Sequence, residues 1–320
     1  MKVVIPGGTG RVGTMLAEKY LARGWEVVML SRCVREAPWR VVEWDGKSMG
    51  PWVAELDGAD VLINMAGRTV NCRYTAENRR QIMDSRLDST RVLGEALASV
   101  EDPPKLWLQA STATIYAHRY DAGNNEDTGI LGGDEQGAPD TWNFSIDVSQ
   151  SWERVANEVA PDGIRLVLLR SAMTMDPAKG GVFDTLSGLA KVGLGGTAGH
   201  GRQFISWIHG ADFVRALDWL IEDEDISGPV NISSPNPLAN AEFMRILRRR
   251  WSVPFGLPTS NWMVELGAVF LRTESELVLK SRYVIPGRLQ EAGFEFEYPD
   301  WDDAAAELVA RSRGQRGVSK

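Results

Sequence analysis

Three glycines near the start of the sequence could hold a phosphate group. Gly7, Gly10 and Gly13 follow the apolar run at residues 3–5 and precede a stretch with the apolar spacing of a helix. A strand, a glycine turn and a helix in this order bring free main-chain amides and the positive end of a helix dipole to one point, where an anion binds. A side chain at Gly7 or Gly10 would hold a pyrophosphate away from the amides, and one at Gly13 would push the helix off the strand. We therefore predict a dinucleotide-binding loop made by Gly7, Thr9, Gly10, Arg11, Val12 and Gly13.

The end of the second apolar run, at residues 26–30, indicates which dinucleotide binds. Ser31 and Arg32 follow this run, and the first acid after it is Glu36. An NAD site carries an acid here for the ribose 2′-hydroxyl, whereas a guanidinium suits the 2′-phosphate of NADP. We therefore expect NADP(H) in preference to NAD(H), with Ser31 and Arg32 at that phosphate. The alternative for Arg32 is a solvated position in a loop.

Two later apolar runs end in residues that could complete the cofactor site. Asp45 ends the third predicted strand, where its carboxylate could accept a hydrogen bond from the adenine amino group. Asn64, Ala66 and Gly67 follow the fourth predicted strand. Small residues at Ala66 and Gly67 would let the chain pass close to the cofactor.

Hydroxyl side chains follow the fifth predicted strand, at residues 106–110, and could perform the chemistry. Ligands of doubly wound sheets bind at the carboxyl ends of central strands. Thr112 lies at this end and Tyr116 follows four residues later. We expect Thr112 beside the nicotinamide and Tyr116 as the group that exchanges a proton with the substrate. The alternative for Tyr116 is a buried ring whose hydroxyl is only hydrogen-bonded.

The elements that must position these residues alternate between strand and helix through the first 170 residues. This alternation predicts an α/β fold with a Rossmann-like, doubly wound parallel sheet. A long amphipathic helix is expected over residues 75–100, with Met83, Leu87, Thr90 and Leu97 on its apolar face.

The regular alternation ends after residue 170. Glycines are dense over residues 180–201, which predicts a loop region without a core helix. Further elements are expected as a helix over 212–221, a strand over 229–232 that returns to the main sheet, and a strand over 294–296. We assign residues 1–170 and about 203–233 to an NADP-binding domain. Residues 171–202 and 234–320 form a smaller C-terminal substrate lobe in this division.

Composition limits the class of protein. The 320 residues are 43% hydrophobic and 24% charged, as in ordinary globular proteins. A net charge of −8 argues against a nucleic-acid surface. The two cysteines give neither a disulfide framework nor a metal-ligand spacing, and no apolar stretch reaches the roughly 18 residues of a membrane helix. We therefore expect a cytoplasmic protein with a small-molecule substrate and without a metal, a nucleic-acid partner or a membrane partner.

With these residues assembled, the sequence resembles an extended, atypical short-chain dehydrogenase/reductase. More narrowly, it is similar to the epimerase family branch that carries an extra C-terminal domain. The matching segments run in order along nearly the whole chain, at residues 7–13, 62–67, 85–86, 195–203, 206–209, 228–231, 235–237 and 291–294. The resemblance implies an oxidoreductase or epimerase that acts on a small polar molecule, by analogy a sugar nucleotide. It also leaves a homodimer as one option, paired through helices such as the one expected over residues 75–100.

The sequence departs from this family at the catalytic pair. Relatives use a Tyr-x-x-x-Lys pair, in which the Tyr exchanges a proton with a substrate hydroxyl and the Lys lowers its pKa. The matching positions here are Ser145 and Ser149. A serine hydroxyl is far too weak an acid to replace an activated phenol, and Ser149 supplies no cation.

Three functions therefore stay open. The first is an NADP(H)-dependent oxidoreductase or epimerase whose acid is another group, with Tyr116 as the leading candidate. The second is a protein that binds NADP(H) without turnover and acts as a nucleotide-responsive binding or regulatory protein. The third, a scaffold with an empty nucleotide site, is the least favoured because the glycine triad and Arg32 would then have little reason to coexist.

Overall fold

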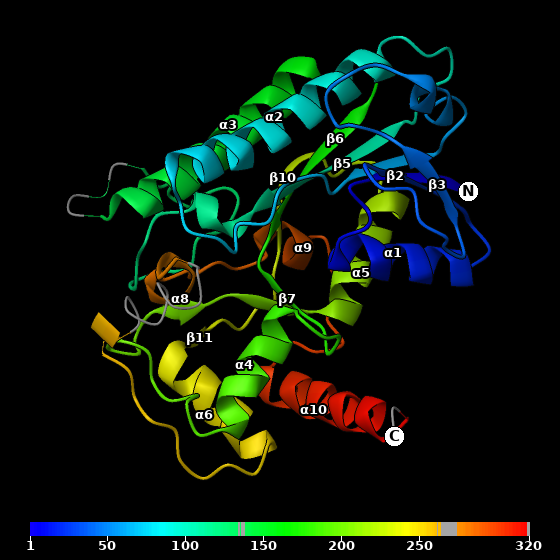
Figure 1. Ribbon diagram of the computed structural model, residues 1–320. Coiled ribbons are helices and arrows are strands. Elements are labelled where there is room, and N and C mark those ends of the chain that lie inside the picture. Colours follow the sequence, from blue (N-terminus) through cyan, green and yellow to red (C-terminus); the bar gives the residue numbers. More distant parts are fainter. Residues whose placement is uncertain (134, 136–137, 261, 264–273, 319–320) are drawn as a thin grey trace.

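A seven-stranded sheet forms the centre of the computed structural model, which describes residues 1–133, 135, 138–260, 262–263 and 274–318 (Figure 1). The strands of this sheet are β1 (Lys2–Pro6), β2 (Glu26–Ser31), β3 (Arg40–Glu43), β4 (Val61–Asn64), β5 (Leu106–Thr112), β6 (Arg165–Ser171) and β10 (Gly228–Ile232). Their order is β10-β6-β5-β4-β1-β2-β3, and every neighbouring pair is parallel. The predicted α/β class, the doubly wound sheet and the return of the strand near residue 230 are confirmed.

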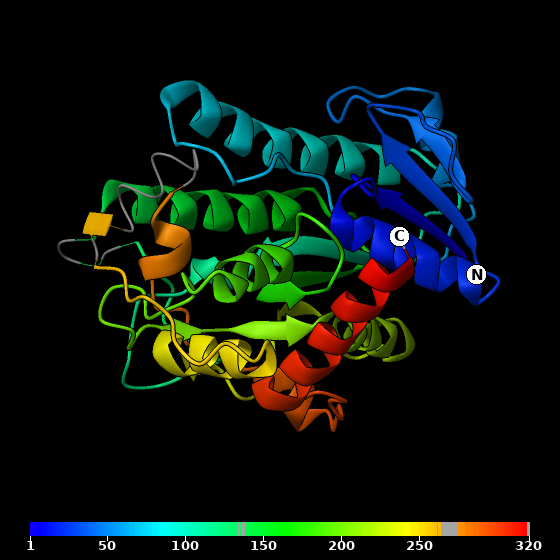
Figure 2. The same cartoon turned by 60° about the horizontal axis from the view of Figure 1, so that its bottom comes forward.

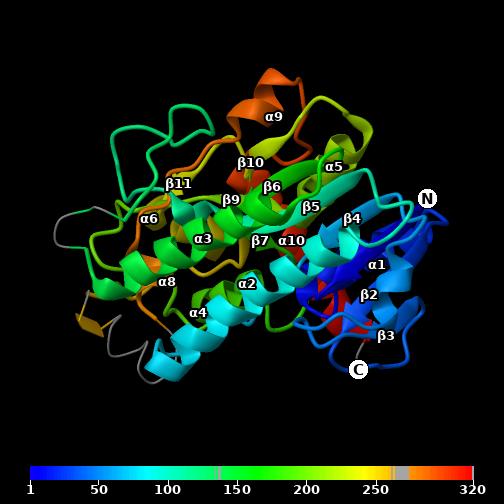
Figure 3. The ribbon, with the colours of Figure 1, turned by 90° about the horizontal axis from the view of Figure 1, so that it is seen from above.

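Helices cover both faces of the sheet. One layer contains α1 and α5, and the other contains α2 and α3, which lie side by side (Figures 1 and 3). The bounds are α1 (Arg11–Ala22), α2 (Ala76–Leu97), α3 (Asp140–Val159) and α5 (Gly210–Glu222), with short 3-10 turns at η1 (Pro51–Glu55) and η2 (Ala113–Ile115).

The sequence of strand β1 is apolar without interruption because both of its faces are buried. Val3 and Ile5 pack in the cluster that includes α1 and α5, whereas Val4 packs in the cluster that includes α2. All three side chains are fully buried, and each contributes about 1.5–3 kcal/mol relative to an exposed position. Burial on both faces fixes the strand that leads into the glycine turn.

A smaller lobe lies below the sheet in Figure 1. Its elements are β7 (Met173–Met175), α4 (Val182–Lys191), β8 (Phe204–Ile205), β9 (Trp207–His209), β11 (Leu238–Ala239), α6 (Asn240–Arg250), α8 (Glu276–Leu279), α9 (Gly287–Glu291) and α10 (Trp301–Val318). The rings of Phe243 and Trp301 stack at 4.0 Å at its centre, and Trp207 meets Trp301 edge-on at 5.0 Å. Figure 2 shows α10 reaching back toward α1.

The expectation that residues 180–201 contain no core helix is wrong. Helix α4 lies in this stretch and buries Phe183, Ser187 and Ala190 against the lobe. The glycines flank this helix or lie on its exposed face, so they do not interrupt the buried stripe. Gly181 is its N-cap, and Gly193 follows its end with a φ of +76°.

The strand expected at residues 294–296 is also absent from the described part of the chain. The alternating pattern there has another cause, because Phe294 packs against Trp219 of α5 with ring centroids 5.9 Å apart. The main chain that follows is held by a side chain, since the amides of Glu297 and Tyr298 both donate to Asp212 at 2.8 Å.

The long helix α2 forms as expected, and Thr75 caps its first turn. Its buried stripe differs in part from the predicted one. Thr90 and Leu97 are buried, but Met83 and Leu87 are only half-buried, and Ile82 is the buried residue of the first two turns. Over the described ranges, no helix is both long and apolar enough to cross a membrane.

Candidate functional site

The glycine loop lies at the point where the strand order of the sheet reverses. Strand β1 has β4 on one side and β2 on the other, and ligands of doubly wound sheets bind in the crevice at such a reversal. Gly7 has a φ of +71°, and a β-carbon on it would lie 2.5 Å from the Ala66 Cα atom. A β-carbon on Gly13 would lie 2.4 Å from the Gly8 Cα atom. Both glycines are therefore required by the packing of the protein itself.

Gly10 differs from the other two glycines. The nearest atom to a β-carbon placed on it is the Gly7 main-chain oxygen, at 3.7 Å. The fold leaves this space open, as a bound pyrophosphate requires. Gly10 is also the N-cap of α1, and among the described residues no side chain caps this helix. The first-turn amides, those of Arg11, Val12 and Gly13, therefore remain available to an anion.

The side chains of the loop point toward the C-terminal lobe. Thr9 and Arg11 border a surface hollow of about 560 Å³ that also includes Asp176 and Arg311. The Nε atom of Arg11 lies 3.3 Å from where a β-carbon on Gly181 would be. The segment that leads into α4 thus lies directly beside the loop.

The end of β2 presents a cationic surface. Arg32 and Arg35 are exposed, and no described carboxylate pairs with either of them. Ser31 is buried, and its hydroxyl donates to the Cys33 main-chain oxygen at 3.1 Å. Ser31 thus shapes the turn that presents Arg32.

Asp45 is exposed and caps its own turn. Its Oδ1 atom accepts hydrogen bonds from the amides of Lys47 and Ser48, at 2.8 and 2.9 Å. These hydrogen bonds, that of Ser48 foremost, lower the pKa of Asp45. The residue is therefore an anionic acceptor, as the predicted adenine contact requires.

The segment after β4 connects the glycine loop with the centre of the sheet. Asn64 is fully buried, donates to Gln109 Oε1 of β5 at 2.9 Å and accepts from the Ala66 amide at 3.0 Å. Ala66 lies against Gly7, and a β-carbon on Gly67 would lie 3.3 Å from the Arg86 Cζ atom. Asn64, Ala66 and Gly67 therefore line one continuous path from the loop to α2.

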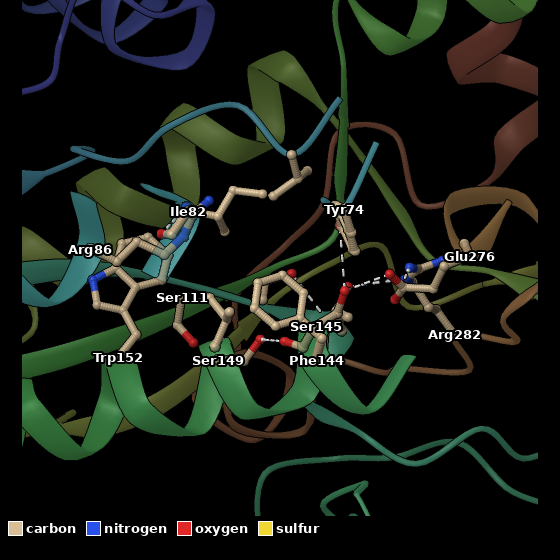
Figure 4. A pocket seen from close by; sticks show the side chains of 14 residues that line it. Tyr74, Ile82, Arg86, Ser111, Phe144, Ser145, Ser149, Trp152, Glu276 and Arg282 are labelled. Atoms are coloured by element: carbon tan, nitrogen blue, oxygen red, sulfur yellow. Dashed lines mark hydrogen bonds and ion pairs between the residues drawn. The ribbon is translucent and has the colours of Figure 1, made fainter. Parts of the chain in front are cut away.

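A cavity of about 250 Å³ lies between α2, α3, the end of β5 and the segment around α8 (Figure 4). Its walls are Val70, Tyr74, Ile82, Arg86, Ser111, Thr112, Thr114, Phe144, Ser145, Val148, Ser149, Trp152, Glu276 and Arg282. Thr112 therefore lies at a cavity, as predicted, and its Oγ1 atom accepts from the Thr114 amide at 3.2 Å. The two serines at the positions of the catalytic pair also line it.

A chain of hydrogen bonds crosses one end of the cavity. Ser145 Oγ donates to the Glu276 carboxylate and lies 3.5 Å from the Tyr74 hydroxyl, and Glu276 forms an ion pair with Arg282 at 3.1 Å (Figure 4). Burial raises the pKa of Tyr74 to about 12, with help from the charge of Glu276. The Tyr74 phenol is therefore protonated at neutral pH. Ser149 Oγ donates to the Ser145 main-chain oxygen at 2.7 Å.

Several residues of this cavity escaped sequence reasoning. Glu276 and Arg282 come from the C-terminal lobe, 131 and 137 residues after Ser145, so no local spacing links them to it. Tyr74 lies in the segment that precedes α2. Arg86 falls within one of the segments that match the family, but its residue type alone predicts no role.

Tyr116 is not placed at the cavity, which corrects its expected place beside the cleft. Its side chain is 2% exposed, and its hydroxyl donates to Asn231 Oδ1 at 3.0 Å and accepts from Arg170 Nη1 at 2.9 Å. Burial raises its pKa. Arg170 forms a double hydrogen bond with Glu153, at 2.7 and 2.8 Å, so Tyr116 belongs to a buried polar network under the sheet end. The turn η2 separates Thr112, which lines the cavity, from Tyr116, which does not.

Lys280 joins the C-terminal lobe to the wall of the cavity. Its side chain is 2% exposed, and its Nζ atom donates to the Thr114 main-chain oxygen at 2.8 Å. Burial, with the nearby charge of Arg282, lowers the pKa of Lys280 to about 8. Across the described residues, no group of three His, Cys, Asp or Glu side chains could hold a metal ion.

The sequence profile of the "NAD dependent epimerase/dehydratase family" matches residues 3–132, and that of a "domain of unknown function (DUF1731)" matches residues 260–308. The second match contains Glu276, Lys280 and Arg282. The first match contains the cavity walls from Val70 to Thr114, whereas the walls from α3 lie outside both matches.

Relatives match nearly the whole chain. The epimerase family protein SDR39U1 of Bos taurus is 30% identical over 314 residues, which cover 97% of this chain and 100% of the relative. The epimerase family protein YfhF of Bacillus subtilis is 29% identical over 313 residues, 97% and 98% of the two chains. The crystal structure of human SDR39U1 (isoform 2) with NADPH superposes with a TM-score of 0.84 at 28% identity, over 97% of this chain and 99% of that one. This chain therefore belongs to the epimerase family.

Proposed function

We propose that the protein binds NADP(H) at the crevice between β1 and β4 and acts as an oxidoreductase or epimerase on a small polar substrate in the cavity. The open space over Gly10 is the observation that carries this proposal. Packing accounts for Gly7 and Gly13 but not for Gly10, and an uncapped helix start lies directly behind it. The NADPH in the structure of human SDR39U1 supports the same cofactor here.

The predicted cofactor contacts follow the path from the loop to α2. The amides at Gly10 to Gly13 would hold the pyrophosphate, Arg32 the 2′-phosphate and Asp45 the adenine. The segment from Asn64 to Gly67 would lie along the ribose next to the nicotinamide. When bound, NADP(H) supplies or accepts a hydride.

The protein must then handle a proton at the substrate oxygen. We do not assign this role to Tyr116, because its hydroxyl donates to Asn231 and accepts from Arg170. Ser145 occupies the place of the family's tyrosine, and its hydrogen bond to Glu276 gives it an acceptor. In the oxidation direction, the substrate hydroxyl donates its proton to Ser145 Oγ while the Ser145 proton moves to Glu276.

A titration with both dinucleotides tests the cofactor assignment. We expect NADPH to bind more tightly than NADH. The substitution Arg32→Glu should lower the affinity for NADPH at least tenfold and change the affinity for NADH little. Arg154→Glu, on an exposed part of α3, is the control for the same change in net charge. Absence of NADPH binding at millimolar concentration would refute the proposal, and unchanged affinity in Arg32→Glu would refute the role of Arg32.

A second function is favoured by one observation. Ser149 stands where the family has its lysine, and its hydroxyl bonds to the main chain of its own helix. The protein could therefore bind NADP(H) without turnover and act as a nucleotide-responsive binding protein. Oxidation of bound NADPH by a panel of small carbonyl compounds separates the two functions, because steady oxidation above the buffer rate is expected only of the enzyme.

A further inference from the structure

Arg86 is the cationic residue at one end of the cavity (Figure 4). It lies on the second half of the path from the glycine loop, next to Gly67. Burial lowers its pKa to about 10, so the guanidinium is still charged at neutral pH. Arg86 is half-buried, and a charge that is partly withdrawn from water is costly unless a partner of opposite sign compensates it.

The partners of Arg86 compensate the charge only in part. Its Nη1 atom donates to the main-chain oxygens of Arg68 and Ile82, at 3.1 and 3.0 Å. The guanidinium also lies over the Trp152 ring, 4.9 Å from its centroid. Among the described residues, no carboxylate pairs with Arg86, and no hydrogen bond engages the edge formed by its Nε and Nη2 atoms. That edge is the one that grips a carboxylate with two parallel hydrogen bonds.

The opposite end of the cavity is electrically balanced. Glu276 and Arg282 pair there at 3.1 Å, and both side chains are at most 10% exposed. The remaining ionised side chain of the described walls is Arg86, so the cavity has a net positive charge. This sign is opposite to that of the whole chain, which carries −8. The cavity therefore selects an anion within an acidic protein.

The walls and the volume limit what that anion can be. Ile82 and Trp152 lie beside Arg86 (Figure 4), and Phe144 and Val148 add apolar surface elsewhere in the walls. A second negative charge against them would be costly, which disfavours a phosphate dianion. A volume of about 250 Å³ is also below the roughly 300–1,000 Å³ of pockets for drug-sized ligands, so the space inside the cavity suits a small molecule.

We propose that the cavity binds a small monocarboxylate with an apolar body, held by the Nε and Nη2 edge of Arg86. This inference rests on the proposed function, because the bound acid is the substrate only if the protein is an NADP(H)-dependent enzyme. A hydroxyl or carbonyl group at the far end of such an acid would reach Ser145 and Thr112. The charged group and the reacting group would thus occupy opposite ends of one cavity.

Benzoate and benzamide test the proposal, because they have the same shape and differ in charge. Calorimetric titration of the wild-type protein, alone and saturated with NADP, should show benzoate binding at least tenfold more tightly than benzamide. Arg86→Gln keeps a donor for the main-chain oxygens but removes the charge, and it should abolish the difference. Arg86→Lys keeps the charge but lacks the two parallel donors of the guanidinium, so it should retain only part of the difference in affinity. The control is Arg80→Gln, on an exposed part of the same helix.

The two proposals fail in distinguishable ways. Equal binding of benzoate and benzamide by the wild type, or full discrimination in a folded Arg86→Gln variant, would overturn the carboxylate site. If Arg86→Gln does not fold, Arg86→Lys provides the test. A ratio of benzoate to benzamide affinity equal to that of the wild type in Arg86→Lys would overturn the bidentate contact. NADPH titration of the same variants reports on the cofactor separately. Loss of NADPH binding with intact benzoate discrimination would overturn only the proposed function.

Discussion

The glycine loop and the cavity are built on different principles. In the loop, Gly7 and Gly13 are fixed by contacts between main-chain atoms, and the available groups are main-chain amides. In the cavity, the chain of hydrogen bonds at one end is made by side chains, and Glu276 and Arg282 come from a distant part of the sequence. The loop retains the pattern of its family, whereas Ser145 and Ser149 replace the catalytic pair in the cavity. Nucleotide binding can therefore persist while the chemistry beside it changes.

The largest effect is expected within the loop itself. Gly13→Ala should lower the free energy of unfolding by about 2–4 kcal/mol, because its β-carbon would lie 2.4 Å from the Gly8 Cα atom. Gly10→Ala should cost less than about 1 kcal/mol, yet it should weaken NADPH at least tenfold. Urea unfolding and NADPH titration measure the two quantities. Equal destabilisation by both substitutions would mean that the fold, and not a ligand, requires Gly10.

Substitutions in the cavity should lower the turnover rate and leave the affinity for the cofactor unchanged. Ser145→Ala and Glu276→Gln should each lower kcat about 100-fold with a carbonyl substrate identified by the panel, because the proton path is broken. NADPH affinity should stay the same. Ser151→Ala, on the same helix with its hydroxyl toward Asp147, is the matched control. Unchanged kcat in Glu276→Gln would remove the C-terminal lobe from the chemistry.

The attachment of the lobe to the cavity wall should depend on pH through Lys280. Its pKa is about 8 in the folded state and about 10.5 in the unfolded chain, so the unfolded chain binds more protons between these values. The contribution of Lys280 to stability should therefore be lowest below pH 8 and rise above it, by on the order of 2 kcal/mol by pH 9.5. Urea unfolding from pH 7 to 9.5 should show this rise in the wild type relative to Lys280→Met. Parallel curves for the two proteins would contradict it.

The smallest effect is expected at Tyr116. Tyr116→Phe removes hydrogen bonds to Asn231 and Arg170, which should lower the free energy of unfolding by about 1–2 kcal/mol. Hydride transfer should be unchanged, because the hydroxyl does not face the cavity. A thermal unfolding curve measures the change in stability, and the rate of NADPH oxidation measures hydride transfer. A large fall in the rate of NADPH oxidation with little change in stability would mean that the Tyr116 hydroxyl takes part in the reaction.

The sequence predicted what depends on local spacing. The order strand, glycine turn and helix predicted the loop, and alternating runs predicted the sheet. Thr112 lies at the carboxyl end of β5 and lines a cavity, and its place beside the nicotinamide stays a prediction. These features follow from neighbouring residues and the geometry of parallel strands.

The rest depends on orientation and on contacts between distant residues. Spacing placed Tyr116 near the end of β5, but the turn η2 decides which side its hydroxyl faces. Glycine density around residues 180–201 hid α4, because composition does not reveal that the glycines flank the helix. Glu276 reaches Ser145 only through tertiary packing, so no pattern in the sequence links them.

The hydrogen bond between Ser145 and Glu276 also has a consequence for biosynthesis. The nucleotide loop is complete within the first quarter of the nascent polypeptide, but the carboxylate leaves the ribosome long after it. During translation the emerging chain therefore contains the whole nucleotide loop before it contains the carboxylate on which the proposed turnover depends.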